Sequence, residues 1–176
     1  MRITTIAGLA FVAAVSPALC QVKVPACYAR VYSSDHLGKH PDQLVTSMTL
    51  ELSPPKSDKP EWLMSVTTRG RSEAQYTGGG CRYDGGLTCY VDCDGGDISI
   101  RPVSPGTIYV ELGREGKGSI QMSRFGCTDD MNSVTLDAGK DDKIFRLEEV
   151  SPRACDDLNR YFKSRGSAPS GGAGPP

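Results

Sequence analysis

The chain has 176 residues, 38% of them hydrophobic and 23% charged, which predicts one folded domain and excludes a mainly disordered or collagen-like chain. Twenty Lys and Arg residues against 21 Asp and Glu residues give a net charge of -1, so electrostatics gives no reason to expect nucleic acid or an anionic membrane as a partner. The 20 glycines and 12 prolines indicate many turns and disfavour a helical bundle.

The N-terminus has the three parts of a secretory signal peptide. Arg2 supplies a positive charge, residues 3–15 form a short apolar core, and small residues lie close to Cys20. The core is too short for a transmembrane helix, which needs about 20 residues, so we expect no transmembrane segment in the mature chain. We place the cleavage after Cys20, with cleavage after Ala18 and lipoprotein processing at Cys20 as the alternatives. This signal predicts a periplasmic or secreted protein.

Loss of residues 1–20 leaves six cysteines, which are Cys27, Cys81, Cys89, Cys93, Cys127 and Cys155. An even number of cysteines in an exported chain predicts structural disulfides, three in this case. The spacing of Cys89 and Cys93 differs from that of a zinc knuckle, so a metal site is the weaker alternative. A three-residue turn at residues 84–86 would place Cys81 opposite Cys89, and we predict that these two are paired.

Apolar and polar residues alternate through most of residues 21–165, which is typical of antiparallel strands with one buried face. Turn-forming segments separate these stretches, with strand starts about ten residues apart. The sequence therefore predicts an all-β fold, an antiparallel meander of about eight strands forming a closed, lipocalin-like barrel, with a sandwich as the alternative. The side chains expected to face inward are Leu44, Met48, Leu50, Trp62, Met64, Val66, Ile98, Ile100, Ile108, Val110, Leu112, Ile120 and Met122.

One C-terminal helix is predicted after Ser151. Ser151 is the candidate N-cap, Pro152 suits the first helical position, and an apolar stripe at helical spacing follows. We expect Cys155 to attach this helix to the barrel through a disulfide. A shorter helical turn is expected at residues 34–39.

The last segment, residues 166–176, contains only glycine, proline, serine and alanine. It has no large apolar side chain to bury, so we predict a disordered tail. The chain therefore divides into a signal peptide at residues 1–20, a disulfide-linked barrel domain at residues 21–165, and this tail.

His36 and His40 are the two histidines of the chain, and on a helix their spacing would place both rings on one face, as a metal site requires. The alternative is a loop in which both rings bond to the backbone. Residues 78–80 are three glycines, interpreted as a bulge before Cys81 rather than an anion-binding loop. No nucleophile elbow or acid–base pair stands out, so the sequence favours a protein that is not an enzyme and needs no cofactor.

Five sequence strings resemble a family of small, exported proteins from alphaproteobacteria whose activity is uncharacterised. The strings are CYARVY at 27–32, HLGKHPDQLV at 36–45, GGGC at 78–81, CYVDCDGG at 89–96 and KIFRL at 143–147. The similarity spans residues 27–155 and implies export, without implying an activity. The expected meander is also similar to lipocalin-type and lysozyme-inhibitor-type barrels in architecture alone.

These observations predict a non-enzymatic, exported binding or envelope-associated barrel. Its expected partner is a small apolar molecule in the lumen or an envelope protein held by loops at one mouth. Trp62, the only tryptophan, is the candidate ligand contact, and the alternative is that it forms the centre of a filled core. Two other functions stay open: a metal-dependent enzyme or metal carrier that uses His36 and His40, and a purely structural envelope protein.

Overall fold

The computed structural model describes residues 21–55, 61–83, 86–92, 94–113, 116–122 and 134–165. The predicted signal peptide and tail lie outside these residues, as do Cys93 and Cys127. The elements of the described residues are β1 (Ala26–Val31), α1 (Ser34–Lys39), β2 (Val45–Leu52), β3 (Trp62–Thr68), β4 (Gln75–Tyr83), β5 (Leu87–Tyr90), β6 (Asp97–Ser104), β7 (Thr107–Leu112), β8 (Ser119–Met122), β9 (Val134–Asp137), β10 (Ile144–Val150), the 3-10 helix η2 (Pro152–Cys155) and α2 (Asp156–Arg165).

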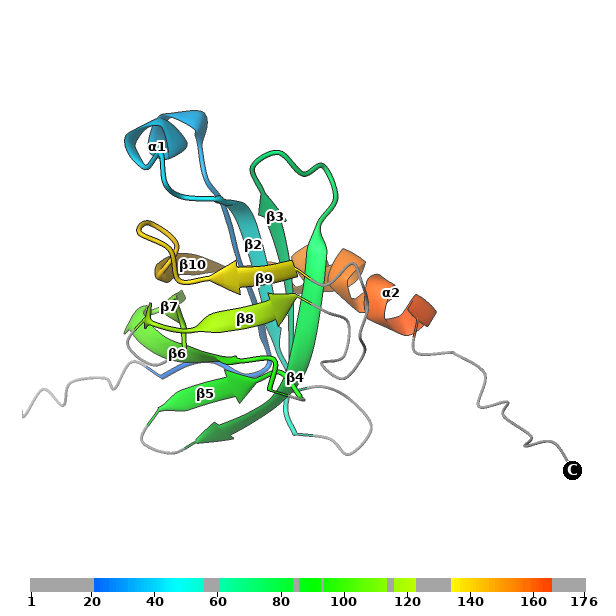
Figure 1. The fold of residues 1–176 in the computed structure, drawn as a ribbon. Coiled ribbons are helices and arrows are strands. Elements are labelled where there is room, and N and C mark those ends of the chain that lie inside the picture. Colours follow the sequence, from blue (N-terminus) through cyan, green and yellow to red (C-terminus); the bar gives the residue numbers. More distant parts are fainter. Residues whose placement is uncertain are drawn as a thin grey trace, which may run out of the picture.

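Eight strands form a closed antiparallel barrel in the order β1, β10, β7, β6, β5, β4, β3 and β2 (Figure 1). The predicted all-β fold with a closed barrel and a C-terminal helix is therefore confirmed. β8 and β9 form a separate two-stranded sheet. Ile120 and Met122, which the sequence places in the meander, reach the core from this separate sheet.

The interior of the barrel is filled with apolar side chains. Trp62, Tyr28 and Phe145 are its largest fully buried residues, each at most 1% exposed. They belong to one continuous cluster to which the barrel strands and the β8–β9 sheet contribute. The alternation of the sequence correctly predicts this face of the strands, because residues two apart share one side of a strand.

Leu44 is the one exception among the side chains predicted to face inward, since it is 55% exposed. The pairing of β2 with β3 shifts register between Val45 and Ser47. This irregularity breaks the period of two, so that Val45 rather than Leu44 lies in the core together with Met48. The prediction for Leu44 is wrong because a bulge in the pairing of β2 with β3 reverses the alternation at this point.

The hairpin β4–β5 has the register predicted from its turn. Tyr83 pairs with Leu87, Cys81 lies opposite Cys89, and these two cysteines form the predicted disulfide. Their Cα atoms are 4.0 Å apart, as in the closer, non-hydrogen-bonded pairs of an antiparallel ladder, and the Cys81 N–H donates instead to the Glu61 carboxylate.

The three glycines at residues 78–80 lie within β4 in an even register with β3, so the predicted bulge is wrong. Because these glycines have no side chains, neighbouring backbone can pack closely against them. A Cβ atom on Gly79 would lie 2.1 Å from the Tyr90 carbonyl oxygen. The Trp62 Nε1–H donates to the same oxygen at 3.2 Å. The glycine therefore lets the backbone of residue 90 approach closely enough to satisfy the only tryptophan.

The α2 helix lies on the outside of the barrel wall (Figure 1). Leu158 and Phe162 bury their side chains against Leu63, an outward-facing residue of β3. A disulfide between Cys27 and Cys155 attaches the helix to β1, which confirms the predicted covalent link. Ser151 lies at the predicted N-cap position and Pro152 follows it at the start of the helix, but the Ser151 side chain makes no capping bond, and the first turn is the 3-10 helix η2.

Strands run on beyond their ladder at several seams of the barrel, among them β4–β5 and β1–β10. At the β4–β5 seam, pairing covers only Gly80–Tyr83 of the longer β4. β8 lies against β4 and β6 at this seam. At the β1–β10 seam, pairing covers three residues of each strand, and the strands then separate. The second seam is the place where the wall of the barrel opens.

Candidate functional site

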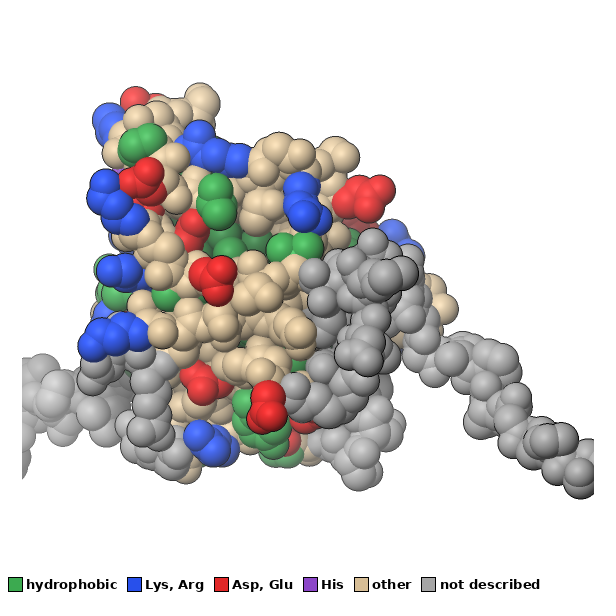
Figure 2. All heavy atoms as spheres, viewed as in Figure 1, with side chains coloured by type: hydrophobic (Ala, Val, Ile, Leu, Met, Phe, Trp, Pro, Cys, Tyr) green, Lys and Arg blue, Asp and Glu red, His purple; other side chains and the backbone are tan. Residues whose placement is uncertain are grey.

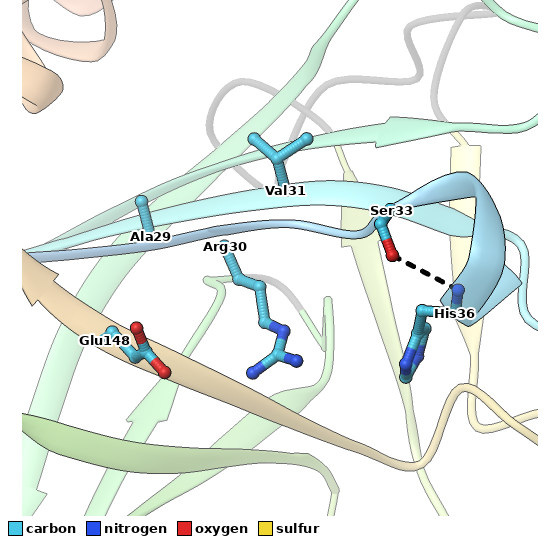
Figure 3. A pocket seen from close by; sticks show the side chains of 6 residues that line it. All are labelled: Ala29, Arg30, Val31, Ser33, His36 and Glu148. Atoms are coloured by element: carbon cyan, nitrogen blue, oxygen red, sulfur yellow. Dashed lines mark hydrogen bonds between the residues drawn. The ribbon is translucent and has the colours of Figure 1, made fainter.

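A pocket of about 350 Å³ opens where β1 and β10 separate (Figure 3). The ladder ends at the pair Ala29–Glu148, although β1 runs on to Val31 and β10 begins at Ile144. We call this pocket the β1–β10 window. Its lining residues are Ala29, Arg30, Val31, Ser33, His36 and Glu148.

Arg30 is the charged residue that enters the window. Tyr28 and Tyr32 are buried, and Arg30 shares their inward face because side chains alternate along β1. Figure 3 shows the Arg30 and His36 side chains extending into the gap, whereas Ala29 and Val31 point away from it. The Arg30 guanidinium carbon lies 5.2 Å from the centre of the Tyr32 ring. With the residues that the structure describes, Arg30 makes no hydrogen bond and no ion pair.

The far side of the window is held in place by Arg69 at the end of β3. Its Nε–H donates to the Gln43 carbonyl at 2.7 Å, and Nη2 donates to the carbonyls of Leu37 and His40 at 2.6 and 3.1 Å. These charge-assisted bonds fix α1 and the loop after it against the barrel. The position of His36 in the window therefore depends on the side chain of Arg69, which directly follows β3.

The predicted helical turn is confirmed as α1, and it brings His36 and His40 together. Their ring centres are 4.4 Å apart in a stacked arrangement, and His36 Nε2 lies 3.0 Å from the Gln43 amide oxygen. His40 Nδ1 is 4.0 Å from a carboxylate oxygen of Asp141. Within the described residues, no group of three His, Cys, Asp or Glu side chains is placed to hold a metal ion. A metal site at His36 and His40 stays a prediction.

Asp142 lies just before β10 and bonds to the backbone at the start of β2. The residue is 1% exposed, and its two carboxylate oxygens accept the N–H groups of Leu44 and Val45 at 2.6 and 3.2 Å. Burial raises the pKa of Asp142 above its ordinary value, while the two N–H donors lower it. Burial also raises the pKa of Tyr32 to about 12, so the ring beside Arg30 is a neutral phenol at physiological pH.

Trp62, the candidate ligand contact, lies in the barrel core and does not line the β1–β10 window. It is fully buried, and its N–H already bonds to the backbone of the chain. These contacts favour the alternative interpretation, in which Trp62 is the centre of a filled core.

The sequence analysis singles out His36 but not Arg30. A signal for Arg30 is present in the strand Tyr28-Ala29-Arg30-Val31-Tyr32, where a cation sits between two aromatic residues at a period of two. A charged residue on the buried face of a strand is uncommon unless it is paired. The sequence does not show that Arg30 lacks a partner among the described residues, because Glu148, which lines the same window, lies 118 positions away in the chain.

No family model, curated protein or solved structure matches this chain. The resemblance to exported alphaproteobacterial proteins stays a prediction, while the lipocalin-like architecture agrees with the eight-stranded barrel. The two disulfides fit a secreted or periplasmic location. Among the described residues, no helix has the length and apolar character needed to span a membrane.

Proposed function

We propose that this protein is an exported, non-enzymatic binding barrel that holds an anionic ligand at the β1–β10 window. The observation that carries this proposal is the inward-pointing Arg30, a partly buried guanidinium without a counter-charge among the described residues. A partly buried cation without a counter-charge is available to a carboxylate or phosphate oxygen, which would bind it through charge-assisted hydrogen bonds. An anion is therefore the ligand that the window is suited to bind.

The packed interior supports a site in the wall rather than in the lumen. The largest core side chains, Trp62 among them, are fully buried in one apolar cluster. Interiors packed in this way have few voids larger than a water molecule. A small apolar guest in the lumen therefore finds no support in this packing, whereas the window is open to solvent and carries a charge.

The local charge balance of the window also favours an anion. Glu148 contributes a negative charge, but its Oε1 lies 3.5 Å from Nη2 of Arg146 on the same strand. Arg30 is left as the unbalanced charge. The Ser33 hydroxyl and the His36 ring add polar groups to the lining. Figure 2 shows basic and acidic side chains interspersed over one face of the molecule, so a selective anion site depends on local geometry rather than on a broad basic surface.

An NMR titration of the oxidised protein with sodium acetate and with inorganic phosphate tests the proposal. Sodium chloride at equal ionic strength is the reference, because salt alone screens surface charges. We expect saturable shifts of the Arg30 side-chain Nε–H and of the Val31 and Ser33 amides. Arg30→Gln should abolish these shifts. If neither salt shifts these signals beyond the chloride reference, the proposal is wrong.

Arg101→Gln is the matched control for this titration. Arg101 also projects from a strand and stacks over a tyrosine, with its guanidinium carbon 4.6 Å from the Tyr109 ring centre. It differs from Arg30 in that it is already paired with Glu111. The control variant should keep the anion response of the unchanged protein.

A further inference from the structure

The backbone of β1 presents an edge to the window. The Tyr32 N–H donates to the Thr46 carbonyl on the β2 side at 2.9 Å. Backbone groups of successive strand residues point to opposite sides, so the N–H and C=O of Val31 point toward β10. The ladder with β10 ends two residues before Val31, and no described residue pairs with it across the window.

The backbone of β10 presents the opposing edge. The Glu149 N–H donates to the Gly106 carbonyl on the β7 side at 2.6 Å. By the same alternation, the N–H and C=O of Arg146 point toward β1. A continued register would place Val31 opposite Arg146, but the strands have separated there. Exposed strand edges of this kind are templates for the addition of another extended chain.

The shape of the window at its two ends favours binding of a peptide terminus over binding of an internal peptide segment. At the narrow end, the ladder closes at the pair Ala29–Glu148, and at the wide end His36 of α1 lines the opening. The volume of about 350 Å³ is near the lower limit of ligand pockets, which span about 300–1,000 Å³. A short chain end fits between these limits, and an extended segment that continues in both directions does not.

The charge at the narrow end determines which terminus of a peptide could bind there. Arg30 follows Ala29 directly, so its guanidinium lies close to the point where an entering chain must stop. A C-terminal carboxylate would pair with this cation, whereas an N-terminal ammonium group would be repelled. The chain would then run antiparallel to β1, with the residue before its terminus beside Val31.

The outer rim of the window is apolar on both sides. Val31 is 81% exposed on β1, and Ile144 is 47% exposed on β10. Side chains of an added strand alternate between its two faces, so those on its outer face would contact this rim. An apolar side chain near the terminus would bury surface that Val31 and Ile144 leave in water.

We infer that the β1–β10 window binds the C-terminal end of an extended peptide from a partner protein, which pairs with the edge of β1 and places its carboxylate at Arg30. This inference rests on the proposed anion-binding function and names the ligand class of the same site. It requires backbone pairing at Val31 in addition to the charge of Arg30. Val31→Pro tests the first requirement, and Arg30→Gln tests the second.

The probe is a mixture of random hexapeptides with free C-terminal carboxylates, compared with the same mixture amidated at the C-terminus. NMR of the oxidised full chain follows the amides of Val31 and Arg146, together with their hydrogen exchange. We expect the free-acid mixture to shift both amides and to slow their exchange. Amidation should weaken the response about tenfold or more, since it removes the charge that Arg30 recognises.

Val31→Pro removes one N–H that faces the window and leaves Arg30 in place. Proline is tolerated at a strand edge, and this N–H is not part of the β1–β2 ladder, so the fold should be kept. We expect Val31→Pro to lose the peptide response at the Arg146 amide, while it keeps the acetate response at the Arg30 Nε–H and the Ser33 amide. Val31→Ala is the matched control that keeps this N–H: it should keep the acetate response and most of the peptide response, losing only the apolar contact of the Val31 side chain. Arg30→Gln should lose both, whereas Arg101→Gln should lose neither.

The outcomes separate the two proposals. Acetate binding without a stronger response to the peptides would overturn the peptide inference and leave the anion-binding function standing. Equal binding of amidated peptides, or an undiminished response in Val31→Pro, would also overturn the inference. Arg30-dependent binding to vesicles of anionic phospholipid, without any peptide response, would assign the site to a membrane headgroup instead. Absence of both the acetate and the peptide responses would remove both proposals.

Discussion

The β4–β5 seam and the β1–β10 seam begin alike and end differently. Each has a disulfide at its paired part: Cys81–Cys89 links the two strands of the first seam, and Cys27–Cys155 links β1 of the second seam to η2, which follows β10. Beyond the ladder, the first seam is covered by the β8–β9 sheet, whose side chains Ile120, Met122 and Leu136 are buried in the core. Beyond the second ladder, no strand of the described residues covers the opening, and Arg30 lines it.

This difference shows two ways in which a barrel manages an incomplete wall. Apolar side chains fill the β4–β5 seam, and their burial contributes to stability. A charged side chain occupies the β1–β10 seam, and its burial does not contribute in the same way unless it is paired. The first seam therefore serves the fold, and the second is available for binding.

Removal of each disulfide gives the largest expected effect. Cys27 and Cys155 are 128 positions apart, and Cys81 and Cys89 are 8 apart. The chain-entropy estimate for loops of these sizes gives a loss of about 5 kcal/mol for the first pair and about 2.5 kcal/mol for the second. Double Cys→Ser variants of each pair, compared by urea unfolding, measure these losses. Equal losses would mean that the two seams are not distinguished by loop length.

Ile120→Ala and Ile144→Ala compare a covered seam with an open rim through the same substitution. Ile120 of β8 is fully buried in the core, and Ile144 is 47% exposed beside the window. We expect Ile120→Ala to lower the free energy of unfolding by about 2–5 kcal/mol, and Ile144→Ala by about 0.5 kcal/mol or less. Urea unfolding measures both. A similar loss in the two variants would contradict the assignment of different roles to the seams.

Asp142→Asn tests the buried carboxylate that replaces strand pairing near the window. The Leu44 and Val45 N–H groups bond to different carboxylate oxygens, and the substitution replaces one oxygen by an NH2 group, so one buried donor loses its partner, at a cost of about 1–3 kcal/mol. Asp141→Asn, at the neighbouring position, is the control and should cost less. Equal effects of the two variants in urea unfolding would show that the two N–H bonds of Asp142 contribute little.

The pH dependence of Asp142 has a definite sign. Burial raises its folded-state pKa above the ordinary 3.8, so the folded protein holds this proton more tightly than the unfolded chain. The resulting contribution to stability is fully present below pH 3.8 and is lost as the pH rises through the folded-state pKa. The stability difference between the unchanged protein and Asp142→Asn should therefore be largest in acid. A difference that grows with rising pH would contradict this assignment.

Arg30→Gln gives the smallest expected effect on stability. It tests directly whether the charged side chain at the β1–β10 seam serves the fold or a ligand. Arg30 has no ion pair among the described residues, whereas Arg69 donates to three backbone carbonyls. We expect Arg30→Gln to change the free energy of unfolding by about 0.5 kcal/mol or less, and Arg69→Gln to lower it by about 1–3 kcal/mol. A large loss in Arg30→Gln would mean that this side chain serves the fold rather than a ligand.

Local patterns of the sequence determined much of this fold. The period of two assigned the inward faces of the strands, and the three-residue connection between Tyr83 and Leu87 determined the Cys81–Cys89 pair. The α1 turn and the helix after Pro152 followed from their own short segments. These features were predictable because each depends on neighbours within one turn, one strand or one hairpin.

The tertiary structure decided whatever depends on how one strand pairs with another. The bulge at Val45 exists only in the pairing of β2 with β3, and it sends Leu44 outward against the local pattern. The β8–β9 sheet covers a seam that no local segment reveals. The window arises because the ladder between β1 and β10 stops at Ala29 and Glu148, which are far apart in the sequence. Local propensity cannot set where such a ladder ends, since that depends on the twist and closure of the whole barrel.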